Sequence, residues 1–451
     1  MTHIWFGSAL LPDGWAHGVG IDVEDGRIAR IERGAEPSWA LERHAIALPG
    51  LPNLHSHAFQ RGMAGLAERR GPSGDSFWTW RDIMYRFVDR MDPEDVEAIA
   101  AQAYVEMLEA GFTRVGEFHY LHHDRDGQAY DNIGELGARI ASAAQETGIA
   151  LTLLPVFYAH GGFGGQAPTH GQRRFINDVS GFGRLMEASR AAVAILPDAV
   201  VGIAPHSLRA ATAEEITAIL PLAGDGPVHI HVAEQVKEVD DCVAFSGTRP
   251  VSYLYDSAEV NERWCLIHAT HVTEAESARM VASGAVVGLC PITEANLGDG
   301  IFPAERFARD GGRYGIGSDS NVLVHAAEEL RTLEYSQRLS LRARNVMAAG
   351  EGRSTGRELF DAALAGGAQA LGAPAGLVEG APADMLSLDS SHPALFSRTG
   401  DAVLDSWIFA ARGNLVDCVW RRGVKLVEGG RHRARGMVAE RFRAAVRKVL
   451  A

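Results

Sequence analysis

The sequence predicts an α/β protein: a (β/α)8 barrel of the TIM type beside a small β-sheet domain built from both chain ends. In the middle of the chain, short apolar runs typical of buried parallel strands alternate with helical patterns. At both ends, strand-like segments alternate in polarity around turns such as Asp25-Gly26, a strong hairpin signal. A doubly wound open sheet is the structural alternative. It usually carries a glycine-rich phosphate turn after an early strand, and none is present.

The first 47 residues read as short strands, including a hairpin over 21–31. Buried strand candidates then follow at 48–55, 113–118, 151–158, 200–204, 228–233, 264–269, 285–290 and 314–318. Helical patterns lie between them, at 93–110, 133–147, 182–196, 213–222, 274–283 and 326–338. Eight strands separated by helices indicate a closed parallel barrel over residues 48–376.

The C-terminal part of the chain returns to strands after one more helix. Hairpin-like segments occupy 384–388, 417–421 and 424–427. A last amphipathic helix places a row of apolar side chains on one face: Val438, Phe442, Val446 and Val449. We therefore expect a composite β domain from 1–47 and 377–431, the barrel over 48–376, and a C-terminal helix over 432–451.

Composition narrows the class of protein. The chain has 451 residues and a net charge of −14 with no basic block, which argues against nucleic acid as a partner. The four cysteines lie far apart, as is typical of reduced thiols in a cytosolic protein. No signal peptide is recognisable. The longest apolar run, near 151–159, is about half the roughly 20 residues of a membrane-spanning helix. We expect a cytoplasmic protein with no membrane partner.

Polar side chains gather at the predicted strand ends, where barrel enzymes keep their chemistry. One or two such residues are often satisfied core groups, but a whole set converging on one rim indicates an active site. The set is His55, His57, Glu117, His119, Tyr120, His206, Arg209, His229, His231, Glu234, His268, Asp319 and Ser320.

Four members of this set predict a metal site. His55 and His57, two residues apart on an extended strand, point to the same face and can bind one cation. His231 and Asp319 complete a His₃Asp set suited to one divalent ion, above all Zn²⁺, with Fe²⁺ or Mn²⁺ also acceptable. His229 could replace His231, although the spacing to Glu234 favours His231. The fourth strand end carries His206 and no lysine or carboxylate, so a bridging ligand for a second metal is missing.

The remaining polar groups suggest a hydrolase. A bound metal lowers the pKa of its water from about 15.7 towards about 7. Glu234, three residues past His231, can sit near that water without binding the metal, which suits a proton shuttle. His268 can hydrogen-bond the nucleophile or the developing charge. We expect other polar and aromatic residues to have no catalytic role. His122 and His123 should be solvated, and Trp78 and Trp80 should pack against other side chains.

The ordered pattern His55-x-His57, His231-x-x-Glu234, His268 and Ser318-Asp319-Ser320 resembles the metal-dependent amidohydrolase superfamily, in its deaminase branch with one metal. Longer motifs resemble the formimidoylglutamate deiminases (N-formimino-L-glutamate iminohydrolases) of bacterial histidine degradation. They are the segments 49–61, 75–85, 116–122 and 204–209.

The resemblance implies a metal-dependent deiminase that hydrolyses N-formimino-L-glutamate to N-formyl-L-glutamate and ammonia, and it suggests a homodimer. It implies substrate contacts from Gln60, Arg81, Tyr120, His206 and Arg209, and we expect Ser320 to contact the substrate as well. Two arginines match the two carboxylates of the substrate, because guanidinium binds carboxylate in a bidentate way. In the expected reaction Asp319 takes a proton from the water, His268 assists the attack, and Glu234 delivers protons to the leaving nitrogen.

Two other functions stay open. A deaminase of a cyclic substrate, such as guanine or a pterin, would favour aromatic stacking and amide groups over two arginines. A catalytically inactive barrel that serves as an assembly module would have lost metal ligands, and here all of them are present.

Overall fold

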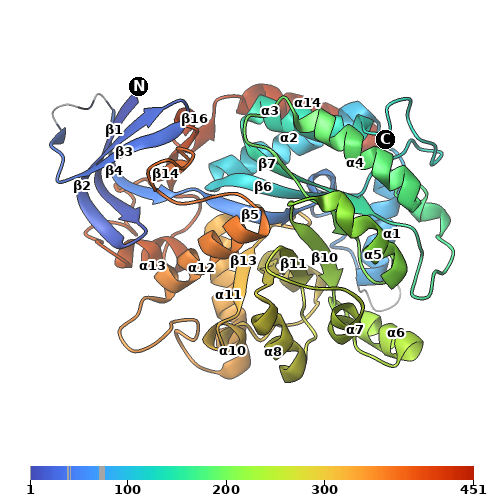
Figure 1. Cartoon of the computed structure of the whole chain (residues 1–451). Coiled ribbons are helices and arrows are strands. Elements are labelled where there is room, and N and C mark those ends of the chain that lie inside the picture. The colour runs from blue at the N-terminus through green and yellow to red at the C-terminus, as the bar shows by residue number, and fades with distance from the viewer. Residues whose placement is uncertain (1, 38–39, 41, 71–76) are drawn as a thin grey trace.

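The computed structural model of the chain describes residues 2–37, 40, 42–70 and 77–451, so Asp75 and Ser76 of the second motif lie outside the described residues. Its centre is a parallel barrel (Figure 1). One half of the wall has the order β5-β6-β7-β8 with β9 beside β7, and the other half the order β10-β11-β12-β13. The strands are β5 (Leu51–Ser56), β6 (Phe112–His119), β7 (Ala150–Phe157), β8 (Val200–Val201), β9 (Ala204–Pro205), β10 (Val228–Val232), β11 (Trp264–His268), β12 (Val286–Leu289) and β13 (Arg313–Ile316).

Isolated bridges close the two halves into a barrel. Ile203 pairs with Val228 at one junction, and Ser56 pairs with Asp319 at the other, both in parallel. Every residue of β6 and of β7 is buried, because one face of each strand lines the barrel interior and the other packs against the outer helices. The predicted (β/α)8 barrel is confirmed.

Helices surround the barrel much as the sequence pattern predicts. The expected ones are α2 (Pro93–Glu109), α3 (Glu135–Thr147), α4 (Val179–Val193), α5 (Ala213–Ile219), α8 (Glu274–Ser283) and α11 (Ala326–Leu341). Capping residues explain the starts of several: Thr273 and Glu276 form a reciprocal capping box at α8, and Asp92 and Asp95 do so at α2. Further helices occur where no helix was predicted, among them α1 (Phe77–Val88), α6 (Val236–Ser246), α7 (Pro250–Ser257), α9 (Pro291–Leu297) and α10 (Ala304–Arg309).

A second sheet, in blue and red beside the barrel in Figure 1, joins the two ends of the chain. Its order is β17-β16-β15-β14-β4-β1-β2-β3. The strands are β1 (Thr2–Leu11), β2 (Gly14–Glu24), β3 (Arg27–Arg33), β4 (Glu42–Pro49), β14 (Met385–Leu388), β15 (Val416–Arg421), β16 (Val424–Glu428) and β17 (Arg431–His432). The N-terminal strand β4 pairs with β1 on one side and with the C-terminal β14 on the other. The small sheet built from both chain ends is therefore confirmed, while the exact domain boundaries stay a prediction.

The strand predicted over 48–55 is in fact two strands. Leu48 and Pro49 pair with β14 in the terminal sheet. The Leu51 amide, in contrast, donates a hydrogen bond to the Gly111 carbonyl and begins the first barrel strand. Gly50 marks the crossing, and a Cβ there would lie 2.2 Å from the Thr113 side chain, so glycine lets the two sheets meet. A continuous apolar run hides this change of sheet.

The chain ends in α12 (Thr355–Ala370), α13 (Ala402–Phe409) and α14 (Arg435–Leu450). Val438 and Val449 of α14 are buried, as the apolar row predicts. Lys448 pairs with Asp92 and Asp95 at the start of α2, which ties the last helix to the barrel. Among the described helices, none combines the length and apolarity needed to cross a membrane.

Candidate active site

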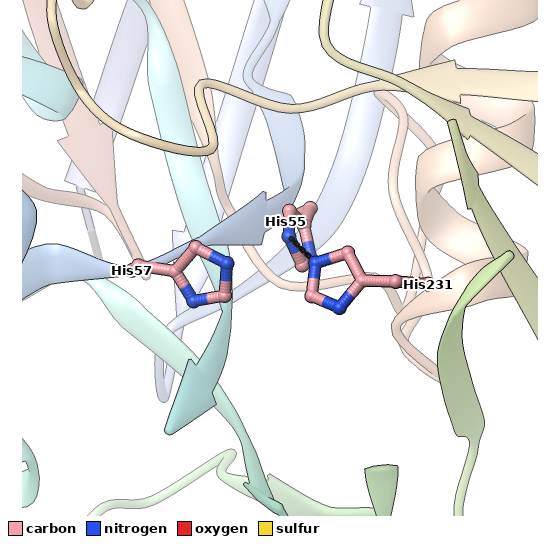
Figure 2. Close-up of side chains that lie close together, drawn as sticks. All are labelled: His55, His57 and His231. Carbon is pink, nitrogen blue, oxygen red and sulfur yellow. Dashed lines mark hydrogen bonds between the residues drawn. The ribbon is translucent and has the colours of Figure 1, made fainter. Parts of the chain in front are cut away.

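Three histidines meet at the C-terminal ends of the barrel strands, as Figure 2 shows. His55 is the last residue but one of β5, His57 follows the strand, and His231 lies on β10. The Nε2 atoms of His55 and His231 are 3.1 Å apart, and Oδ1 of Asp319 lies 3.5 Å from Nε2 of His55 and 3.3 Å from Nε2 of His57. The four residues predicted as metal ligands therefore converge on one point.

Backbone pairing brings these ligands together. The Asp319 amide donates to the His55 carbonyl at 3.0 Å, and the His57 amide donates to the Asp319 carbonyl at 2.9 Å. A Cβ on Gly317 would lie 2.8 Å from the His55 backbone, so only glycine lets β13 approach β5 this closely. Asn321 strengthens the junction, since its Nδ2 lies 3.1 Å from the carbonyl oxygens of His57 and Asp319.

Hydrogen bonds also orient the imidazole rings. Nδ1 of His57 lies 2.9 Å from the Phe118 carbonyl, and Nδ1 of His231 lies 3.0 Å from the His206 carbonyl. A carbonyl accepts only, so each Nδ1 carries the proton and each Nε2 keeps a lone pair directed at the cluster. Burial lowers the pKa of His55 to about 3, which keeps that ring neutral. Neutral nitrogens and one carboxylate are the donor set of a divalent metal.

His268 faces two carboxylates on the open side of the cluster. Its Nε2 lies 3.9 Å from Oε1 of Glu234 and 3.8 Å from Oδ2 of Asp319, while its Nδ1 lies 3.1 Å from Oε1 of Glu294. Burial alone would lower the pKa of His268, but Glu234, Glu294 and Asp319 raise it to about 10. Burial raises the pKa of Glu234 to about 7 against the opposing charges of His268 and Arg209.

A cavity opens onto this group. Its lining includes most of the side chains predicted from the sequence: His57, Gln60, Arg81, Tyr120, His206, Arg209, His231, Glu234, His268 and Asp319. Gln60 donates to the Tyr120 hydroxyl at 2.9 Å, which fixes both side chains at the wall. Burial would lower the pKa of Arg209, but Glu238 and Glu234 raise it, so the guanidinium keeps its charge inside the protein.

Two predicted residues do not line the cavity. The hydroxyl of Ser320 is 3.0 Å from the hydroxyl of Thr293. His55 belongs to the histidine cluster and is fully buried. The alternative ligand His229 points away, because its Nε2 bonds to the Ala370 carbonyl at 2.7 Å. The geometry therefore favours His231 over His229.

Several residues at the site escaped the sequence reasoning. Glu294 sits on α9 after the seventh strand, whose end was not assigned any polar group. Trp80, expected to pack against other side chains, lines the cavity together with Tyr85 from the same unpredicted helix α1. His122 and His123 are buried and bond to backbone carbonyls, so their assignment as solvated residues is wrong. The Trp-x-Trp-Arg sequence of α1 is the signal that could have identified this helix as part of the cavity wall.

Comparison with known proteins gives the class of this barrel. Residues 46–426 match the Amidohydrolase family, and residues 1–45 match the N-terminal domain of formimidoylglutamate deiminase HutF. A formimidoylglutamate deiminase of Pseudomonas aeruginosa is 52% identical over 98% of this chain and 98% of its own length. The chain therefore belongs to the amidohydrolase family and, within it, to the formimidoylglutamate deiminases. It is a hydrolase that acts on C–N bonds.

Solved structures agree with this placement. An amidohydrolase from Brucella melitensis superposes with a TM-score of 0.97 at 57% identity, covering 100% of both chains. An adenosine deaminase from Xanthomonas campestris, solved with bound zinc, has a TM-score of 0.80 at 22% identity over 100% of this chain and 98% of its own. The second likeness shows the shared fold alone.

Proposed function

We propose that this chain hydrolyses N-formimino-L-glutamate to N-formyl-L-glutamate and ammonia, as a step of histidine degradation. The observation that carries the proposal is the combination of two arginines with a His₃Asp cluster in one cavity. Nε of Arg81 and Nε of Arg209 are buried without a hydrogen-bond partner in the described part of the chain. A buried Nε–H group without a partner suits an anionic ligand, and the proposed substrate carries two carboxylates.

We propose that His55, His57, His231 and Asp319 hold one divalent cation, with Zn²⁺ as the first candidate and Fe²⁺ or Mn²⁺ as alternatives. The fixed tautomers of His57 and His231 support this assignment. When bound, the cation supplies a Lewis acid that makes water nucleophilic at neutral pH.

The side chains around the cluster divide the proton transfers. Asp319 faces both the cluster and His268, so its carboxylate accepts a proton from the attacking water. His268 donates a hydrogen bond to the oxygen as it adds to the formimino carbon. Glu234, which lies beside His268, delivers protons to the terminal nitrogen. The two protons that this nitrogen gains are those of the attacking water: one is passed on from Asp319, and the other comes from the hydroxyl of the tetrahedral intermediate. The bond from carbon to that nitrogen then breaks, ammonia leaves, and the oxygen remains as the formyl group.

Other side chains of the cavity wall recognise the substrate. Arg81 and Arg209 bind the two carboxylates, and Gln60, Tyr120 and His206 fix the orientation of the substrate. Ser320 belongs to the loop that carries Asp319, and its bond to Thr293 suits support of that loop better than substrate contact.

A deaminase of a cyclic base is the second candidate. Tyr120, Tyr158 and Phe175 line the cavity and could stack on a ring. Aromatic lining therefore fits both candidates, whereas two charged arginines fit only the dicarboxylate. Ammonia release should be compared for N-formimino-L-glutamate, N-formimino-L-aspartate, guanine and cytosine. We expect the glutamate derivative to be the fastest substrate, and faster turnover of guanine or cytosine would reverse the assignment.

We further propose a cytoplasmic homodimer. All four cysteines are free, as a reducing compartment requires. The dimer rests on the family likeness, and light scattering of the purified protein tests it directly.

A further inference from the structure

Trp78 has three cationic side chains around its indole ring. Cζ of Arg81 lies 4.6 Å from the ring centroid, Cζ of Arg209 lies 5.7 Å away, and Nζ of Lys237 lies 5.8 Å away. All three distances fall within the reach of cation–π attraction. Arg81 is one turn further along α1, Arg209 follows β9, and Lys237 lies in the first turn of α6. One ring thus connects three separate segments at the mouth of the barrel.

Like charges so close together repel, and proteins usually place a carboxylate between them. At this site the nearby carboxylate of Glu238 is bound to the backbone instead: it accepts hydrogen bonds from the amides of Ala233 and Glu234, each at 3.1 Å. Nε of Arg81 and Nε of Arg209 remain without a partner among the described residues. A carboxylate paired with either arginine would compete with an anionic substrate, whereas an aromatic ring attracts a cation without cancelling its charge.

Lys237 differs from the two arginines. Its side chain is 58% exposed and pairs with Asp241 one turn away on the same helix. Only the two arginines line the catalytic cavity. The ring therefore serves two pocket cations and one surface cation, which supplies a matched control.

We propose that Trp78 is a positioning residue for dicarboxylate recognition: its indole face holds the guanidinium groups of Arg81 and Arg209 at the cavity wall while leaving both charges available to the substrate. This inference rests on the proposed function, because it presumes that the arginines bind the two substrate carboxylates. Trp78 itself does not line the cavity and acts through the arginines.

The first test replaces the ring. Trp78→Leu removes the π face, and kcat/KM for N-formimino-L-glutamate should fall roughly 3- to 30-fold, mainly through KM. Trp78→Phe keeps a weaker face and should lie between Trp78→Leu and the parent, so it remains informative if the leucine variant folds poorly. Lys237→Met should stay within about twofold of the parent. A Trp78→Leu enzyme with unchanged kcat/KM, or a larger effect of Lys237→Met, would overturn the inference.

The second test separates positioning from general structural damage. Glutarate has the two carboxylates but no formimino group, so its dissociation constant reports on recognition alone. Trp78→Leu should weaken glutarate binding in the parent and have a smaller effect in an Arg209→Met background, because the contact with Arg209 is then already lost and only the contact with Arg81 remains. Equal effects in the two backgrounds would show that Trp78 acts independently of Arg209 and would overturn the inference.

The two proposals fail in different ways. If the parent enzyme neither turns over N-formimino-L-glutamate nor binds glutarate, the proposed function is wrong. If the parent does both and Trp78→Leu behaves like the parent, only the role of Trp78 is wrong.

Discussion

Glu234→Gln removes the proposed proton carrier with little change in shape. The turn beside it should persist, because the carboxylate of Glu238 holds the amides of Ala233 and Glu234. The substitution should also spare the metal, since the proposed ligands are His55, His57, His231 and Asp319, and Glu234 is not among them. A general acid–base group contributes typically 10²- to 10⁴-fold to the rate, or about 2.7–5.5 kcal/mol of barrier. We expect kcat to fall by that factor.

The assay combines steady-state ammonia release with metal analysis of the same preparation. Asp240→Asn is the matched control, because Asp240 is an exposed carboxylate on the adjoining helix α6. The control should keep both the metal and the parental kcat. Loss of metal from Glu234→Gln would make Glu234 a ligand, and a kcat within tenfold of the parent would remove it from the proton pathway.

Three further substitutions test other parts of the site. His231→Ala should lose metal and activity together, and retained stoichiometric metal would contradict its role as a ligand. Arg209→Met should lower kcat/KM for the dicarboxylate roughly 30-fold to several thousand-fold, from the about 2–5 kcal/mol lost when one partner of a desolvated charge pair is removed. The metal should stay, and an unchanged preference for the dicarboxylate over its monoamide would exclude Arg209 from recognition. Glu329→Gln tests a buried acid: burial raises the pKa of Glu329 well above its ordinary value, so the parent should lose stability relative to the variant as the pH rises from 5 to 8. In the unfolded chain the Glu329 carboxyl has its ordinary pKa, so it loses its proton at a lower pH than in the folded protein. The free energy of unfolding therefore falls by at most about 1.4 kcal/mol per pH unit. Parallel unfolding midpoints across that range would contradict a protonated Glu329.

Strand periodicity was the strongest guide to the fold. The buried strand β7 is an almost continuous apolar run, and helices such as α8 have recognisable caps. The point where the chain changes sheet at Gly50 could not be predicted, because both flanking segments are apolar and only the space beside Thr113 distinguishes them. Helix α1 was missed as well, although Phe77, Trp80, Met84, Phe87 and Val88 recur at the spacing of one helical face and could have indicated it.

The candidate metal cluster was predictable because each predicted ligand lies near or just past the end of a strand, and barrel geometry brings strand ends to one rim. The residues behind the cluster could not be predicted. The turn from β12 into α9 brings Glu294 to His268, and no motif or residue spacing in the sequence indicates this contact. The cations around Trp78 likewise come from segments that only the folded barrel places side by side.

The identity of the products tests the central claim most directly. The formimino carbon of the substrate has two bonds to nitrogen, and the account requires that the bond to the terminal nitrogen break. Carbon NMR of a reaction with substrate labelled at that carbon should show N-formyl-L-glutamate, with one equivalent of ammonia released. Formation of L-glutamate and formamide instead, or no reaction by the metal-replete enzyme, would contradict the account.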